Sequence, residues 1–264
     1  MEISFICIYN NVKQLNDMLV PSLKLLGFGA SIDGLVKGGE GYNALFINNI
    51  DNHYKSAAQA FNSEIKANFS QLGDILVFIH QDIAFDNIDF WNRLKSEFEV
   101  NKNQIIGAAG KCTKGYVLSN LKYQKTNDYI VTHQINEKCE VLSLDECCFA
   151  ITKDLFKNLW FDGKTCFHWH LYAVDLCYEA KRKYNVNSYV IPYIIYHKTD
   201  DSIGLRADNY FIRTMWRLTR KYHKSFNRIY STCYIVDTSI GLALPNLLHA
   251  YCYNLLRDIK KLLK

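Results

Sequence analysis

Proline and glycine are scarce in this sequence, with three and 13 residues among 264. Flexible linkers are usually rich in glycine, serine or proline, so the composition leaves no room for a long one. Internal repeats and low-complexity runs are also absent. Hydrophobic residues make up 49% and charged residues 22%, as in an ordinary globular protein. The length fits one large α/β domain, or one domain with an extension.

Long apolar runs and paired cysteine motifs are missing too. No run reaches the roughly 18 apolar residues that a membrane-spanning helix needs. The first residues, MEISFICIYNN, lack the basic region of a secretory signal peptide and lead directly into a predicted strand. The nine cysteines are scattered without a CxxC pair, which indicates reduced thiols. We therefore expect a cytoplasmic protein.

Acidic residues are scarce near the end of the chain. Residues 205–264 contain 11 Lys and Arg but three Asp and Glu, a formal charge of +8, whereas residues 1–204 sum to −3. We therefore predict a domain over residues 1–204 and a basic, helical extension over residues 205–264. The extension contains no recognisable nucleic-acid-binding module, so we expect no nucleic-acid partner.

Short apolar runs alternate with amphipathic stretches in the predicted domain. The pattern predicts strands at 3–9, 44–50, 75–79, 104–109, 141–151 and 189–196, and helices at 15–26, 57–65, 90–100, 152–159 and 168–184. The glycine-rich residues 27–41 predict turns, and residues 111–140 a loop or a hairpin. Strands that alternate with helices predict an α/β fold, with a mixed, mostly parallel sheet flanked by helices.

The stretch DILVFIHQDIAF, residues 74–85, organises this prediction. Ile75 to Ile79 have the apolar, β-branched composition of a buried parallel strand, and His80, Gln81 and Asp82 follow it. Ligands of open α/β sheets bind outside the carboxyl ends of the strands, where a carboxylate can meet a metal ion or a phosphate. The alternative is a strand that ends in a simple polar turn.

Several short motifs occur in an order that resembles a known family. They are KSAAQAFN (55–62), FIHQD (78–82), IIGAAG (105–110), LDECCFA (144–150) and HLYAVDLC (170–177), followed by a predicted strand that ends in His197. The ordered set resembles the family-2-like glycosyltransferases of the GT-A fold. More narrowly, it resembles the bacterial branch with His-Gln-Asp where most members have Asp-x-Asp. The resemblance covers residues 1–204 and implies inverting sugar transfer from a nucleotide-sugar, most often a UDP-sugar.

A divalent metal fits the chemistry that this resemblance implies. Negative charge builds on the leaving diphosphate, and Mn²⁺ or Mg²⁺ offsets it. Asp82 offers a carboxylate and His197 an imidazole, and the resemblance implies these ligand roles. A surface histidine is the alternative for His197. His80 departs from the usual first Asp, and we expect it, with Gln81, to contact the nucleotide.

The first two predicted strands end in groups that suit a nucleotide. Tyr9 offers an aromatic face for the base, and Asn10, Asn11 and Asn52 offer amides. Asp51 offers an acid for the ribose hydroxyls, and Lys55 a cation for phosphate. Simple turn chemistry, which also favours Asn and Asp, is the alternative.

Inverting transfer also needs a general base for the acceptor hydroxyl. The family has an Asp two positions before the Asp-Leu of its late helix, which is Asp175–Leu176 here, but residue 173 is alanine. The remaining candidates are Asp145, Glu146, His170 and Asp175, of which we favour the acidic pair. His170 and Asp175 would lie about 140° apart on one helix, so both cannot point into one site. A helix-stabilising contact is the alternative for Asp175.

The last helix is predicted to begin at Pro245 and to be amphipathic. Its basic side carries Arg257, Lys260, Lys261 and Lys264, and its apolar side Leu248, Tyr251, Leu255, Ile259 and Leu262. Such a helix is typical of attachment to an anionic membrane surface. The alternative is packing on the domain or on a partner, and an oligomer is compatible with the sequence.

These observations predict a cytoplasmic glycosyltransferase on the inner face of the plasma membrane. We expect a lipid-linked saccharide acceptor, in bacterial surface polysaccharide or glycan assembly. One alternative is the extension of a protein-linked glycan. Another is a non-catalytic nucleotide-sugar-binding or scaffold subunit, which Ala173 would allow.

Overall fold

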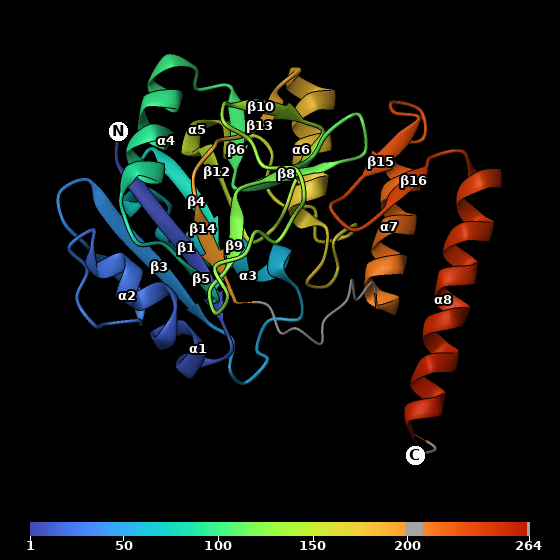
Figure 1. Cartoon of the computed structure of the whole chain (residues 1–264), viewed down its shortest axis with the longest axis horizontal. Coiled ribbons are helices and arrows are strands. Elements are labelled where there is room, and N and C mark those ends of the chain that lie inside the picture. The colour runs from blue at the N-terminus through green and yellow to red at the C-terminus, as the bar shows by residue number, and fades with distance from the viewer. Residues whose placement is uncertain (199–207, 263–264) are drawn as a thin grey trace.

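An eight-stranded mixed sheet forms the centre of the computed structural model, which describes residues 1–198 and 208–262, with side chains through residue 254 (Figure 1). Its order is β10-β13-β6-β12-β4-β1-β3-β2. Five strands run in one direction: β3 (Tyr42–Asn48), β1 (Ile3–Tyr9), β4 (Ile75–Ile79), β6 (Gln104–Gly107) and β13 (Asn187–Val190). The other three are β2 (Gly34–Lys37), β12 (Cys148–Thr152) and β10 (Cys139–Val141). The predicted mixed, mostly parallel α/β sheet is confirmed.

Strand β4 lies inside the sheet, between β1 and β12, and has the bounds that its apolar run predicts. All five of its residues are at most 1% exposed. Alternate side chains enter two cores, with Ile75, Val77 and Ile79 on one face and Leu76 and Phe78 on the other. Because both faces are covered, the first polar residues of this stretch appear only where the strand ends.

Helices cover both faces of the sheet. One face packs against α1 (Val12–Asp17), α2 (Leu19–Lys24) and α4 (Asp89–Val100). The other packs against α3 (Ala57–Asn68), α5 (Lys153–Phe156) and α6 (Tyr172–Tyr184), with the 3₁₀ turn η1 (Phe69–Gln71) after α3. Ser56 caps the N-terminus of α3, because its side chain accepts a hydrogen bond from the Gln59 amide.

Several predicted helix and strand bounds are wrong. Two prolines and one residue with a left-handed backbone conformation explain the differences. The helix expected at 15–26 is two helices, α1 and α2, because Pro21 cannot donate the amide hydrogen bond that would join them. The helix expected from residue 168 starts at Tyr172, since Leu171 has φ +66°. The strand expected at 189–196 is β13 and a separate β14 (Ile195–His197), with Pro192 between them.

Two small sheets complete the α/β domain. One has the order β5-β14-β9, from β5 (Ile83–Ala84), β14 and β9 (Leu121–Tyr123). The other contains β11 (Ser143–Leu144), β7 (Ala109–Lys111) and β8 (Val117–Ser119). The region predicted as a loop or hairpin therefore supplies short strands to both. Pairing of His197 with Ile83 places the end of β14 beside the end of β4.

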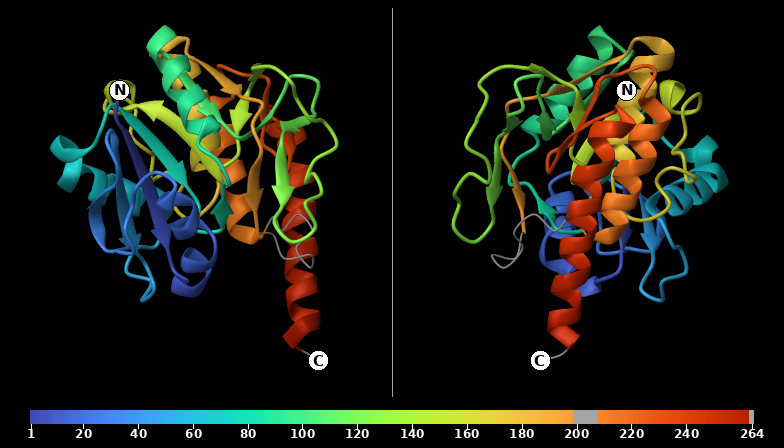
Figure 2. Two further views of the ribbon diagram at one scale, coloured as in Figure 1. Left: turned by 60° about the vertical axis from the view of Figure 1, so that its left-hand side comes forward. Right: turned by 90° about the vertical axis from the view of Figure 1, so that its right-hand side faces the viewer.

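The C-terminal extension contains α7 (Asn209–Tyr222), a hairpin of β15 (Arg228–Tyr230) and β16 (Ile235–Asp237), and α8 (Ile240–Leu262). Figure 2 shows α7 and α8 side by side at one edge of the molecule, with the end of α8 projecting. The sequence did not predict the hairpin, and α8 begins before Pro245, which lies inside it. Helix α7 covers the face of α6 that points away from the central sheet, and the two helices share an apolar core.

A buried ionic network joins α6 to α7. Asp175 on α6 is 3% exposed, and Lys221 on α7 donates to both of its carboxylate oxygens, at 2.8 and 3.0 Å. The hydroxyl of Tyr222 donates to the same carboxylate at 2.8 Å. A carboxylate removed from water needs such partners, so the network makes the position of α7 depend on α6.

We expect Lys221→Ala to destabilise the protein by about 2–4 kcal/mol, because it leaves the charge of Asp175 buried without its cation. Urea unfolding followed by circular dichroism measures the loss. Lys13→Ala is the control, since it removes an exposed ion pair with Asp17. Equal midpoints for the two variants would contradict this role of the network.

Candidate metal and nucleotide site

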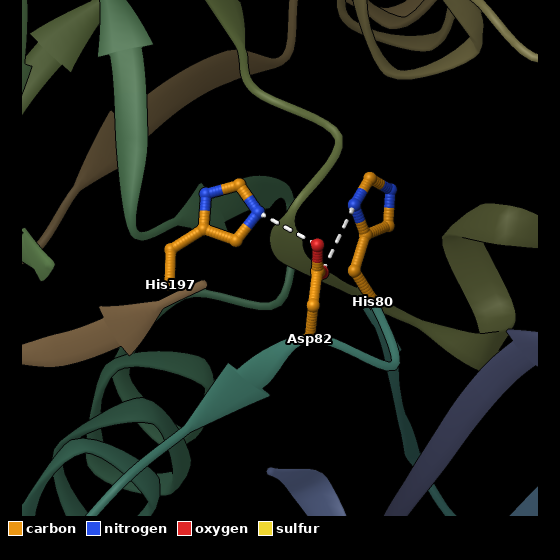
Figure 3. Close-up of side chains that lie close together, drawn as sticks. All are labelled: His80, Asp82 and His197. Atoms are coloured by element: carbon orange, nitrogen blue, oxygen red, sulfur yellow. Dashed lines mark ion pairs between the residues drawn. The ribbon is translucent and has the colours of Figure 1, made fainter. Parts of the chain in front are cut away.

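Three candidate metal ligands converge at the carboxyl end of β4. His80 and Asp82 lie in the turn between β4 and β5, and His197 is the last residue of β14 (Figure 3). Their side chains point toward one another from two segments that are far apart in the chain. The register of β14 with β5 brings them together, since it sets His197 opposite the residue after Asp82.

The geometry of this His-Asp-His cluster fits a divalent cation. One ligand atom from each residue lies within 4.8 Å of the others. His80 Nδ1 is 3.9 Å from Asp82 Oδ1, and His197 Nε2 is 3.3 Å from Asp82 Oδ2. Asp82 Oδ1 is buried and has no hydrogen-bond partner among the described residues. Two imidazoles and one carboxylate suit Mn²⁺ better than Mg²⁺, which prefers oxygen ligands.

The charges of the cluster are strongly coupled. Burial lowers the pKa of His80, despite the opposing charge of Asp82. Burial also disfavours the charged form of His197, but the hydrogen bond and charge of Asp82 outweigh it and raise the pKa of His197. The pKa of Asp82 is lowered because His197 and His80 together overcome the effect of its burial. Protonated His197 and ionised Asp82 therefore stabilise each other.

Tyr172, which sequence reasoning missed, holds the other side of the His80 ring. Its hydroxyl lies 3.2 Å from His80 Nε2, so His80 Nδ1 is the nitrogen that faces Asp82. Metal-binding histidines commonly use their second nitrogen in this way. Tyr172 is 3% exposed and begins α6. In the sequence, Tyr172 stands among apolar residues. Nothing there indicates that the Tyr172 hydroxyl contacts His80, which lies 92 residues earlier in the chain.

A cavity of about 260 Å³ opens beside the cluster. Its wall brings together five residues that the sequence predicts for the site: Asn10, Asn52, His80, Gln81 and Asp82. It also includes groups that the sequence analysis did not select, among them Asn49, Phe61, Trp169 and Tyr172. The cavity therefore lies where the carboxyl ends of β1, β3 and β4 meet, as expected for an open α/β sheet.

Gln81, in the turn after β4, forms hydrogen bonds with the residues that follow β1. The backbone amides of Asn10 and Asn11 both donate to its Oε1, at 3.1 and 3.0 Å. Its Nε2 donates to Asn10 Oδ1 at 2.8 Å. This side chain therefore fixes one edge of the cavity.

The other predicted nucleotide residues do not line this cavity. Tyr9 is buried in the core, and Asn11 caps α1 by accepting a hydrogen bond from the Gln14 amide. Asp51 is exposed. Lys55 donates to the carbonyl of Asn52 at 2.9 Å, which places both residues on the same connection between β3 and α3.

The acidic pair has two different environments. Asp145 Oδ1 accepts from the Cys147 amide at 3.0 Å, and Oδ2 accepts from the Thr232 hydroxyl at 2.7 Å. Glu146 Oε1 is buried and has no hydrogen-bond partner in the described part of the chain. Burial and the charge of Asp145 raise the pKa of Glu146 well above its usual value, against backbone hydrogen bonds from Tyr172 and Leu171.

The remaining candidate bases have partners in the C-terminal extension. His170 Nε2 is 3.2 Å from Asp208 Oδ2, and it precedes α6, so the helical-wheel comparison with Asp175 does not apply. Asp175 is bound by Lys221 and Tyr222. Both side chains are therefore bound by residues of the extension.

No model of a known protein family and no curated protein matches the sequence. Solved structures do match the fold. GalNAc-T7 with UDP, GalNAc and Mn²⁺ superposes with a TM-score of 0.53 at 11% identity, over 86% of this chain and 51% of that one. TarS of S. aureus superposes with a TM-score of 0.52 at 12% identity, over 85% of this chain and 40% of that one. This chain thus spans about half or less of their lengths, and it shares the GT-A fold of these glycosyltransferases.

We expect Mn²⁺ to raise the melting temperature more at pH 8 than at pH 6. The raised pKa of His197 keeps its proton at the lower pH, and a metal ion has to displace that proton. Without metal, the stability from protonated His197 is present below about pH 6.5 and is lost as the pH rises through the raised pKa. Thermal shift of chelator-treated protein with added MnCl₂ measures the effect.

His197→Gln should lose most of the Mn²⁺ effect, and His249→Gln, which changes an exposed histidine on α8, should keep it. An equal Mn²⁺ shift in the wild type and in His197→Gln would rule out His197 as a ligand.

Proposed function

We propose that the chain is a metal-assisted glycosyltransferase that moves a sugar from a nucleotide-sugar, with UDP as the nucleotide, to a saccharide acceptor with inversion. The observation that carries the proposal is the His80–Asp82–His197 cluster, of which His80 and Asp82 line a cavity at the carboxyl strand ends. The GT-A fold supports it, and GalNAc-T7, which shares that fold, binds UDP and Mn²⁺. The ordered motifs favour the family-2-like branch with His-Gln-Asp.

The cavity supplies groups for the nucleotide. Asn10 and Asn52 offer amides for the base and the ribose, and Trp169 offers the aromatic face that the buried Tyr9 does not. Asp51 and Lys55, on the connection beside Asn52, are the candidates for ribose and phosphate. A bound Mn²⁺ would offset the charge that develops on the leaving diphosphate, and His80, Asp82 and His197 are the residues that would hold it.

We propose Glu146 as the general base. Its backbone hydrogen bonds come from Leu171 and Tyr172, directly before position 173, where alanine replaces the acid of the family pattern. As the acceptor oxygen bonds to the anomeric carbon, its proton passes to this carboxylate, and the bond to the diphosphate breaks. In its ionised form, a carboxylate with a raised pKa is a stronger base than an exposed one. Asp145 remains the alternative.

Purified protein should release UDP from a UDP-sugar when Mn²⁺ and a saccharide acceptor are present. Asp82→Ala should reduce the rate to background, because the carboxylate ligand is lost, while circular dichroism stays unchanged. A coupled UDP assay over a panel of sugars measures the rate. Tight UDP binding without turnover on any acceptor extract would instead indicate a non-catalytic nucleotide-sugar-binding subunit. Near-wild-type turnover of Asp82→Ala would refute the metal mechanism.

Glu146→Gln should lower kcat by about 10²-fold or more and leave UDP affinity nearly unchanged, because only proton transfer is affected. Initial rates and isothermal titration with UDP give the two quantities. Asp145→Asn is the comparison. If it loses the larger part of kcat while Glu146→Gln keeps full activity, Asp145 is the base.

The C-terminal helix α8 is our candidate for the contact with a membrane that holds the acceptor. Helix α8 buries Ala243 and Leu247 in the core that it shares with α7, but it leaves Leu242, Leu244 and Leu248 exposed by 61%, 47% and 54%. The predicted basic residues 257–264 lie outside the described side chains. Within the described residues, no helix is both long and apolar enough to cross a membrane. We propose that α8 attaches the enzyme reversibly to an anionic membrane surface that holds a lipid-linked acceptor.

Changing Leu242, Leu244 and Leu248 to Ser together should abolish sedimentation with anionic phosphatidylglycerol vesicles. The melting temperature should stay within about 2 °C of the wild type, because these side chains are exposed. Val100→Ser, which changes an 88% exposed apolar residue on α4, is the control. Failure of the wild type to bind vesicles would show that the leucines serve another contact.

A further inference from the structure

The hairpin of the C-terminal extension ends in a tightly closed turn, residues 231–234. The Ser231 amide donates to the Tyr234 carbonyl at 2.8 Å, and the Tyr234 amide donates to Ser231 Oγ at 2.9 Å. Ser231 is 1% exposed, so the turn is packed against the protein rather than free in solvent. In Figure 1 the hairpin lies between the central sheet and α8.

Two side chains of the α/β domain hold this hairpin in place. The Ser143 hydroxyl, on β11, donates to the Tyr230 carbonyl at 2.5 Å. Tyr178 on α6 uses its hydroxyl twice: it donates to the Arg228 carbonyl at 3.2 Å and accepts from the Tyr230 amide at 2.9 Å. Strand β15 is therefore fixed against two elements that flank the acidic pair.

The turn brings the hydroxyl of Thr232 into contact with Asp145 of the acidic pair. Thr232 Oγ1 donates to Asp145 Oδ2 at 2.7 Å, a short, charge-assisted hydrogen bond. The Cys147 amide holds the other oxygen, and the Asp145 amide donates to the Ala109 carbonyl at 2.9 Å. Both carboxylate oxygens thus have a donor on opposite sides, which leaves the group one orientation.

The position of Asp145 matters because its charge reaches the reacting centre. It acts on His80 and His197 in the metal cluster and on its neighbour Glu146. A rotation of this carboxylate would change the electric field at all three groups.

We propose that Thr232 is a positioning residue, which holds Asp145 in its orientation and so makes the C-terminal hairpin a part of the transfer site. The role in transfer rests on the proposed function, whereas the contact itself does not. The extension would then have two tasks: α8 contacts the membrane, and the hairpin completes the acceptor side.

Two substitutions at Thr232 in the full-length chain test the proposal. Thr232→Val keeps the shape and removes the hydroxyl, and Thr232→Ser keeps the hydroxyl. Thr232→Val should lower kcat about tenfold or more with the KM for the UDP-sugar unchanged, and Thr232→Ser should restore most of it. Thr214→Val is the control, because that buried hydroxyl on α7 donates to the Tyr210 carbonyl, in the extension.

A double-mutant cycle in the melting temperature tests the contact without activity. Thr232→Val should lower the melting temperature by about 2–4 °C in the wild type and have little effect in Asp145→Ala, which removes the acceptor. Additive losses would overturn the contact. Three results would overturn the positioning role. The first is a coupled loss of melting temperature with an unchanged kcat. The others are an equal kcat loss in Thr214→Val and a failure of Thr232→Ser to restore kcat. If the wild type transfers from no nucleotide-sugar, the proposed function fails, and the cycle alone decides whether Thr232 holds Asp145.

Discussion

The carboxylate of Asp82 is the group on which the rest of the site depends. It lies at the end of a strand buried on both faces, and its Oδ1 has no hydrogen-bond partner among the described residues. A charge withdrawn from water is costly unless a cation or a donor compensates for it. His197 supplies part of that compensation, and the small sheet β5-β14-β9 is what holds His197 there. A divalent ion would supply the compensation that His197 does not.

The sequence predicted the strand that organises the site because its signal is local. Five apolar residues followed by His-Gln-Asp define both β4 and its polar end. Asn10, Asn52, Gln81 and Asp82 line the cavity for the same reason, since parallel strands present their carboxyl ends at one edge. His197 was predicted from the resemblance and a strand end, and the geometry places it in the cluster.

The features that the sequence missed are set by tertiary contacts. The orientation of His80 toward Asp82 depends on the Tyr172 hydroxyl, and the start of α6 depends on the positive φ of Leu171. The three-residue strands of the hairpin have no clear periodicity, and their position comes from Ser143 and Tyr178. The helical wheel drawn over His170 and Asp175 failed because the backbone between them is not one continuous helix.

The order of the site residues along the chain bears on how the protein is made. His197 follows Asp82 by 115 residues, and Thr232 follows Asp145 by 87. During synthesis, β1, β3 and β4 leave the ribosome long before the segments that complete the His-Asp-His cluster and contact Asp145. Contacts of such long sequence separation form late and slow the folding of a chain. We therefore expect metal to bind only after His197 has emerged, so that products terminated before this residue lack the site.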